Sequence, residues 1–289
     1  MRWHQSGATP SNISANKYYL AIALFISVRF LKMHVKILGC SGGIGGSTLR
    51  TTSLLIDNDI LIDAGTGVCD LSLQALKAID HVFITHAHLD HIACLPFILD
   101  SVGDLRSSPL TMHATQATQD VIRKHIFNWQ IWPDFSEIPS PENPFLCFNT
   151  IAVGKPLVIG ERRITALPAN HSVPAVGYQL DNLHNGASLV FSGDTGSCPP
   201  LWEVVNRIPD LRYLLIEAAF PNSQRELAQL SKHFCPSMLL SELDKLKSRP
   251  EILITHAKPG LAEQIEQELR QGASAHNINM LIGESVLSF

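Results

Sequence analysis

The six residues from His86 to His91 constrain this chain more than any other feature. They read His-Ala-His-Leu-Asp-His and follow an apolar run at residues 81–85 that is typical of a buried strand. Three imidazoles and a carboxylate therefore gather where that strand ends, and burying so many polar groups costs free energy unless something binds them. Imidazole and carboxylate together suit zinc and its first-row neighbours, so the pattern predicts a metal site rather than a polar loop.

A site for two metal ions needs more ligands than these six residues supply. Three candidates each follow another apolar, strand-like run: His171, Asp194 and His256. Taken singly, each is better explained as a cap or turn residue, and only the three together, in this order, favour a metal site. The sequence Ile-Thr-His-Ala occurs at residues 84–87 and again at 254–257. This echo indicates two similar halves that face one another across a shared site.

The combined set resembles the ligands of the metallo-β-lactamase superfamily of αββα hydrolases, and it comprises His86, His88, Asp90, His91, His171, Asp194 and His256. The resemblance implies an α/β fold, the αββα sandwich, and two metal sites. One would be held by His86, His88 and His171, and the other by Asp90, His91 and His256, with Asp194 as the bridge. A bridging aspartate is similar to the phosphodiesterase and glyoxalase branches, and nearby Cys198 is not expected to be a ligand.

Further segments resemble the class II 3′,5′-cyclic-nucleotide phosphodiesterases: residues 38–43, 50–53, 62–67, 88–92, 191–196, 216–222 and 254–259. The Gly-His-Leu-Thr-Pro segment of that family appears here as Lys-His-Phe-Cys-Pro at residues 232–236, which keeps the His and the Pro. By this resemblance His233 would protonate the leaving oxygen or hold a phosphoryl oxygen. Helix capping is the alternative role for His233.

The resemblance implies a dinuclear metal hydrolase that converts 3′,5′-cyclic AMP to 5′-AMP. Its cofactors would be two divalent ions, with zinc as the first choice and manganese or iron as alternatives. Asp90 would be both a ligand and a proton acceptor. Two other functions stay open: a transfer-RNA 3′-processing endonuclease, which residues 170–178 resemble, and a noncatalytic metal-binding scaffold.

Composition limits the partners. The chain has 289 residues, of which 45% are apolar, so residues 33–289 are expected to form one metallo-hydrolase domain. There are 22 Lys and Arg against 26 Asp and Glu, a net charge of −4, which is not the basic footprint of a protein that holds long nucleic acid. We expect a small anionic nucleotide as substrate, and a homodimer is compatible with the sequence.

Residues 1–32 are a predicted N-terminal extension, either upstream of a native start at Met33 or an added segment. Their apolar run, residues 18–30, is too short to predict a stable membrane span, and a basic start and a cleavage site are both missing. Six scattered cysteines without a Cys-x-x-Cys pair favour reduced thiols. We expect a cytoplasmic protein, or a periplasmic or secreted one if residues 1–32 act as a signal.

Apolar spacing and turn residues predict a hairpin at residues 52–62 and helices that include 91–99 and 114–127. Strands and helices alternate in both halves, which favours layers of both. The proline-rich segment 128–144 carries Trp132 and Phe135. These aromatic side chains either pack on the core or line a pocket for a purine ring.

Overall fold

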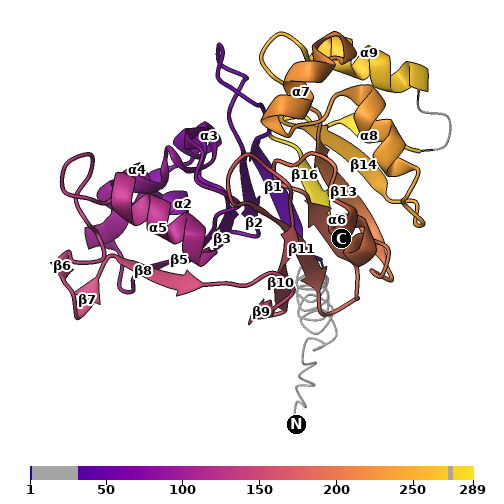
Figure 1. Cartoon of the computed structure of the whole chain (residues 1–289). Helices are drawn as coiled ribbons and strands as arrows, with labels where there is room; N and C mark the ends of the chain where they lie inside the picture. The colour runs from indigo at the N-terminus through magenta and orange to yellow at the C-terminus, as the bar shows by residue number, and fades with distance from the viewer. Residues whose placement is uncertain (2–31, 273–275) are drawn as a thin grey trace.

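The computed structural model of this chain describes residues 1, 32–272 and 276–289 (Figure 1). The expectations for the extension at residues 1–32 fall almost wholly outside these residues. The boundary at residue 33 and the single domain that follows it stay predictions. Within the described ranges, no helix has the length and apolar character to cross a membrane.

Two seven-stranded sheets form the centre of the described part of the chain. In the first sheet the order is β16-β1-β2-β3-β4-β5-β8, with bounds β1 His34–Gly39, β2 Ser53–Ile56, β3 Ile60–Ile62, β4 His81–Phe83, β5 Leu110–Ala114, β8 Leu146–Thr150 and β16 Val286–Ser288. In the second the order is β15-β14-β13-β12-β11-β10-β9, with bounds β9 Pro156–Ile159, β10 Arg162–Pro168, β11 Val176–Asn182, β12 Ser188–Phe191, β13 Leu211–Glu217, β14 Glu251–Thr255 and β15 Ile278–Met280. The predicted hairpin at residues 52–62 is confirmed as the antiparallel pair β2–β3.

Helices cover the outer face of each sheet (Figure 1). Against the first sheet lie α2 Leu73–Lys77, α3 Leu89–Ile92, α4 Leu95–Val102 and α5 Gln116–His125. The second half of the chain supplies α6 Pro199–Val205, α7 Arg225–Ser231, α8 Pro236–Leu243 and α9 Ala262–Gly272. Short elements complete the fold: η1 Thr66–Asp70, η2 Gly103–Leu105, η3 Asn222–Gln224, β6 Pro139–Ser140 and β7 Asn143–Pro144. The predicted α/β fold and its αββα layering are confirmed.

Apolar side chains from both sheets meet in the middle layer. Ile37 and Phe83 come from the first sheet, and Tyr178 and Phe191 from the second. The Tyr178 hydroxyl donates a hydrogen bond to the carbonyl of Ile84 at 2.7 Å, and its ring meets Phe83 edge-on. Because the central strands are buried on both faces, they read as continuous apolar runs rather than alternating ones.

Strand direction brings the carboxyl ends of several strands to one edge. In the first sheet β3, β4 and β5 are parallel. In the second sheet β10 and β12 run the same way, since each is antiparallel to β11, and β12, β13 and β14 are parallel. The residues that follow β10, β12, β13 and β14 therefore emerge together, which is where ligands gather in sheets of this kind.

The helix predicted at residues 91–99 is split in two. Helix α3 ends at Ile92 and α4 begins at Leu95, with Pro96 in its first turn. Proline fits there because its missing N–H would have no partner within the helix. The Cys94 amide donates to the carbonyl of Ala64 at 2.8 Å, which ties the break to the segment after β3.

Replacing Tyr178 with phenylalanine tests the contact between the sheets. The Tyr178→Phe change leaves the buried Ile84 carbonyl without this donor, so the free energy of unfolding falls by about 1–2 kcal/mol. Denaturant unfolding at constant pH measures it. Tyr213→Phe is the matched control, because Tyr213 is only half-buried and lies against Phe289 at the margin of this layer. Equal effects of the two changes would contradict the assignment.

Candidate metal centre

Strand ends from both sheets supply one group of polar side chains. His86 follows β4 of the first sheet, whereas His171, Asp194 and His256 follow β10, β12 and β14 of the second. The loop and short helix after β4 add His88, Asp90 and His91. All seven residues of the predicted ligand set are thus brought together, in two clusters that can each hold a metal ion, and His171 and Asp194 form a third such group with His233.

The first cluster is made of three imidazoles, from His86, His88 and His171. Nε2 of His86 and Nε2 of His171 lie 3.0 and 3.2 Å from Nδ1 of His88. In two of these rings the nitrogen that faces away from the cluster has a hydrogen-bond partner. Nδ1 of His86 lies 3.0 Å from the Thr85 hydroxyl, and Nδ1 of His171 lies 3.3 Å from the Lys232 carbonyl. These outer contacts favour the tautomers whose lone pairs point into the cluster.

The second cluster comprises Asp90, His91, Asp194 and His256. Asp90 Oδ2 lies 3.7 Å from Nε2 of His256 and 3.9 Å from Nε2 of His91. The two rings stack with centroids 5.4 Å apart. Two imidazoles and two carboxylates are the mixed nitrogen and oxygen donor set that zinc, manganese and iron accept.

Asp194 occupies the middle of the site. Its Oδ2 lies 3.2 Å from Nε2 of His256, 3.3 Å from Nε2 of His91 and 3.7 Å from Nε2 of His86, so it faces both clusters. Burial would raise the pKa of Asp194, but the neighbouring imidazoles, His256 first, hold it well below its usual range. The group is an ionised carboxylate at neutral pH, placed where a bridging ligand is needed.

The donors fit a pair of divalent cations. Among the residues that the structure describes, Nε2 of His91 is buried and has no hydrogen-bond partner, although Asp194 Oδ2 lies 3.3 Å away. Burial lowers the pKa of His171 to about 4 and that of His256 to about 3, so both rings are neutral at pH 7 and offer lone pairs. Burial would lower the pKa of His91, but the carboxylates of Asp194 and Asp63 raise it well above its usual value. The neutral rings that face one another are poorly satisfied by each other alone. A cation in each cluster would satisfy them.

Asp63 is a supporting residue to which the sequence analysis gave no role. It follows β3 and accepts three contacts, from Nδ1 of His91 at 2.7 Å and from the amide and hydroxyl of Thr85 at 2.8 Å each. Such a carboxylate fixes the ring orientation of a metal-binding histidine. The sequence did contain a signal for Asp63: it follows the apolar strand β3, just as His86 follows the neighbouring strand β4.

His233 lies at the rim of the clusters and is paired with Glu217. Its Nδ1 lies 2.7 Å from Glu217 Oε1, and its ring stacks on His256. Burial would lower the pKa of His233, but Glu217 raises it above its usual value. Glu217 also accepts from the amides of Thr195 and Phe234, so its position is fixed. The side chain of His233 caps neither neighbouring helix, since Asn222 accepts from the Ser237 amide in the first turn of α8, but the His233 amide donates to the Ala228 carbonyl at 2.8 Å and so helps to end α7.

Glu217 was also missed as a functional residue, although it ends the apolar strand β13. The glycine-rich loop at residues 39–46 lies against the segment that carries His256. A Cβ at Gly42 would meet the His256 carbonyl at 2.4 Å, so only glycine allows this approach. Lys258 donates from Nζ to the Gly42 carbonyl at 2.8 Å, and this ammonium lies 3.5 Å from Nε2 of His256. The loop thereby places a fixed positive charge beside the clusters.

Trp132 and Phe135 pack rather than line the site. Phe135 is only 5% exposed and lies in the core between Phe127 and Phe145. Trp132 is half-buried and meets Phe97 edge-on. The hollow that adjoins the clusters is elsewhere: it measures about 510 Å³, and its lining includes Thr115, Val153 and the loop at residues 169–176. The purine-pocket hypothesis for Trp132 and Phe135 is therefore not supported by their positions.

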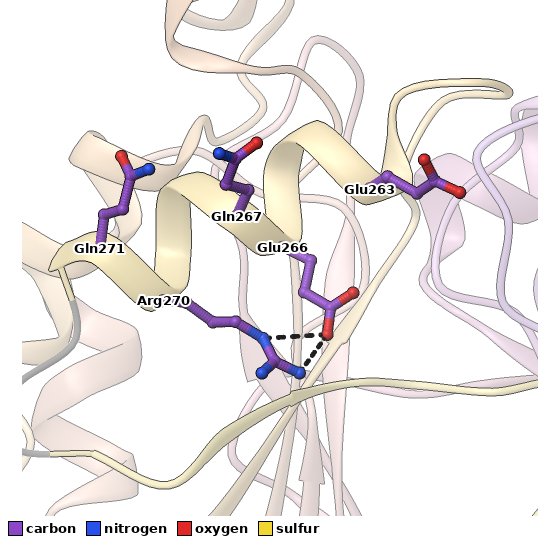
Figure 2. Close-up of a pocket in the computed structure, with 5 residues that line it drawn as sticks. All are labelled: Glu263, Glu266, Gln267, Arg270 and Gln271. Atoms are coloured by element: carbon purple, nitrogen blue, oxygen red, sulfur yellow. Dashed lines mark hydrogen bonds and ion pairs between the residues drawn. The ribbon is translucent and has the colours of Figure 1, made fainter.

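A second hollow lies on α9, and its lining residues are drawn in Figure 2. Glu266 and Arg270 form an exposed ion pair one helical turn apart, at 2.6 Å, and Glu263, Gln267 and Gln271 complete the surface. None of these side chains belongs to the clusters. An exposed pair of this kind contributes little free energy, and we assign this hollow no chemistry.

Comparison with known proteins identifies the family that the sequence motifs resemble, the metallo-β-lactamase superfamily. Residues 58–270 match the model of the beta-lactamase superfamily domain. A probable 3′,5′-cyclic-nucleotide phosphodiesterase of Yersinia pestis is 28% identical over 313 aligned positions, which cover 88% of each chain. A ribonuclease Z of Clostridium beijerinckii is 31% identical, over 50% of this chain and 47% of its own. The crystal structure of unliganded yeast PDE1 superposes with a TM-score of 0.75 at 22% identity, covering 89% of this chain and 99% of that one. This chain belongs to the metallo-β-lactamase superfamily, and it is a metal-dependent hydrolase.

Proposed function

We propose that this protein is a dinuclear phosphodiesterase that hydrolyses 3′,5′-cyclic AMP to 5′-AMP. The observation that carries the proposal is the pair of clusters that meet at Asp194, with the Glu217–His233 pair beside them. The Yersinia pestis relative supports the substrate class, because its likeness extends over 88% of both chains. The free thiols favour a reducing compartment, and we place the protein in the cytoplasm.

The ligands of one cation would be His86, His88 and His171, and those of the other Asp90, His91 and His256, with Asp194 shared. Zinc is our first choice, with manganese and iron as alternatives. Two bound cations supply Lewis-acid activation of water and charge stabilisation at the phosphoryl oxygens. Asp63 would hold the His91 ring through Nδ1. Asp90, which is partly exposed, would accept a proton from the attacking water.

His233 is the group that would serve the leaving 3′ oxygen. Glu217 holds Nδ1 of His233 at 2.7 Å, which leaves Nε2 to donate a proton or to hold a phosphoryl oxygen. Burial of the pair, with Glu217 fully enclosed, keeps the geometry fixed and excludes competing water. The ammonium of Lys258 adds positive charge on the same side of the site, next to His256.

The substrate would enter beside His171. The hollow there has the volume that small ligands occupy in proteins, and its walls combine polar and apolar side chains. The ribonuclease Z alternative is supported by the match to the Clostridium beijerinckii protein, which covers about half of each chain. The net charge of −4 favours a small nucleotide over a long RNA.

The first prediction of this proposal concerns metal content. Protein reloaded with zinc or manganese should bind about two ions per chain, because each cluster supplies the three or four protein ligands of one site. Elemental analysis of the purified protein measures it. Asp194→Ala should lose metal from both sites, whereas Asp100→Ala, at an exposed position on α4, should lose none. A stoichiometry that never exceeds one would rule out the two-metal account.

The second prediction concerns His233. His233→Ala should retain both metals and lower kcat by roughly 10²–10⁴-fold, because a positioned proton donor is lost. Turnover and metal content are measured on the same sample. His184→Ala is the matched control, since His184 is exposed on the β11–β12 turn. Unchanged turnover in His233→Ala would show that His233 has a structural role only. Loss of metal would show that His233 is a metal ligand.

The third prediction separates the two substrates. The enzyme should hydrolyse 3′,5′-cyclic AMP efficiently and cleave precursor transfer RNA poorly, because a folded RNA needs many phosphate contacts and a chain with a net charge of −4 has no excess of basic side chains for them. Specificity constants for both substrates are measured at two salt concentrations. Asp194→Ala serves as the control for contaminating nucleases.

Efficient and salt-sensitive cleavage of the RNA, with negligible turnover of the cyclic nucleotide, would favour the ribonuclease alternative instead. Tight binding of two metals without turnover of either substrate would point to the noncatalytic scaffold.

A further inference from the structure

Two cysteine side chains touch each other close to the metal centre. The Sγ atoms of Cys69 and Cys94 lie 3.3 Å apart, although the residues are 25 positions apart in sequence. Both thiols are reduced in the structure. Thiols in such contact need only a small movement to form a bond of about 2.05 Å. Their separation in the chain means that the fold, rather than local sequence, brings them together.

The two thiols sit on the two segments that support the second metal cluster. Cys69 belongs to η1, just after the loop that carries Asp63, and Cys94 belongs to the break between α3 and α4. Backbone hydrogen bonds already join these segments, from the Ala64 amide to the His91 carbonyl at 2.6 Å and from the Cys94 amide to the Ala64 carbonyl. The stretch from Cys69 to Cys94 contains the whole His-x-His-x-Asp-His motif.

The two sulfur atoms differ in access, as a reactive pair requires. Cys69 is exposed, so a dissolved oxidant can reach it. Cys94 is only 3% exposed, and burial raises the pKa of its thiol to about 12. A buried thiol of this kind resists external reagents, and the neighbouring sulfur is the partner within reach. The exposed thiol would therefore react first and the buried one would resolve the product.

We propose that Cys69 and Cys94 form a reversible oxidation site that closes a disulfide across the metal-binding loop. The oxidant is a low-molecular-weight disulfide. The Cys69 thiolate attacks it, forms a mixed disulfide and releases one small thiol. Cys94 then attacks the Cys69 sulfur, its proton passes to the departing sulfur, and the second small thiol is released. Two protein thiols are oxidised and one external disulfide is reduced to two thiols.

The disulfide acts as a clasp on the metal loop. It closes a covalent ring around residues 69–94, so any local opening that frees His86, His88, Asp90 or His91 becomes more restricted. Metal would then leave more slowly when a chelator competes for it. This consequence rests on the proposed ligand set, whereas formation of the disulfide does not depend on it or on the activity.

The experiment uses the full chain, loaded with zinc and fully reduced, with and without glutathione disulfide. Intact mass and peptide mapping should show the loss of two hydrogens and a peptide that links Cys69 to Cys94, and reduction should restore both thiols. Cys147→Ser is the matched control, because it removes a half-buried thiol on β8 that lies outside the pair, and it should behave like the wild type. Cys69→Ser should form no such link.

The second readout is the rate of zinc loss to a chelator, followed with a metal-sensitive dye. Oxidation should slow it by at least about threefold in the wild type and in Cys147→Ser, but leave Cys69→Ser unchanged. Protein that ends as a glutathione adduct, or does not react, would overturn the oxidation site. A linked peptide with unchanged or faster zinc loss would overturn the clasp while leaving the proposed phosphodiesterase activity to its own test.

Discussion

Convergence of strand ends on the Asp194 carboxylate is the constraint on which the rest of the structure depends. Its Oδ2 lies within 3.7 Å of imidazoles that come from both sheets, so the two halves must pack with their carboxyl edges in register. The apolar layer between the sheets, with Tyr178 at its centre, fixes that register. The packing that stabilises the sandwich therefore also fixes the geometry of the metal centre, because a shift between the sheets would separate the metal-binding side chains.

Support behind the donors follows the same rule. Asp63 directly follows β3 and holds His91, and Glu217 ends β13 and holds His233. Both carboxylates are fully buried, and each is satisfied by backbone amides as well as by its histidine. A buried carboxylate with several fixed donors is a rigid support. Rigid support matters in a catalytic site, since small displacements of reacting groups cost large factors in rate.

Much of this arrangement is predictable from sequence, because a motif such as His-x-His-x-Asp-His after an apolar run has few structural solutions. The motif and the strand-like runs before His171, Asp194 and His256 indicated that these side chains meet, and the resemblance to the metallo-β-lactamase superfamily implied the αββα layers. The supporting roles of Asp63 and Glu217 depend on which strands are neighbours, which no local pattern states. For Trp132 and Phe135 the sequence left two alternatives open, and the structure supports packing on the core. The sequence could not decide between them, because the exposure of an aromatic side chain in a loop depends on long-range packing.

The central claim is that two cations lie on either side of Asp194. Anomalous diffraction from crystals of the zinc-loaded protein, collected on both sides of the zinc absorption edge, tests it most directly. We expect two peaks, one within about 2.0–2.2 Å of nitrogen atoms of His86, His88 and His171, the other similarly close to His91, His256 and Asp90, with Asp194 in contact with both. A single peak, or two peaks whose ligands exclude Asp194, would contradict it.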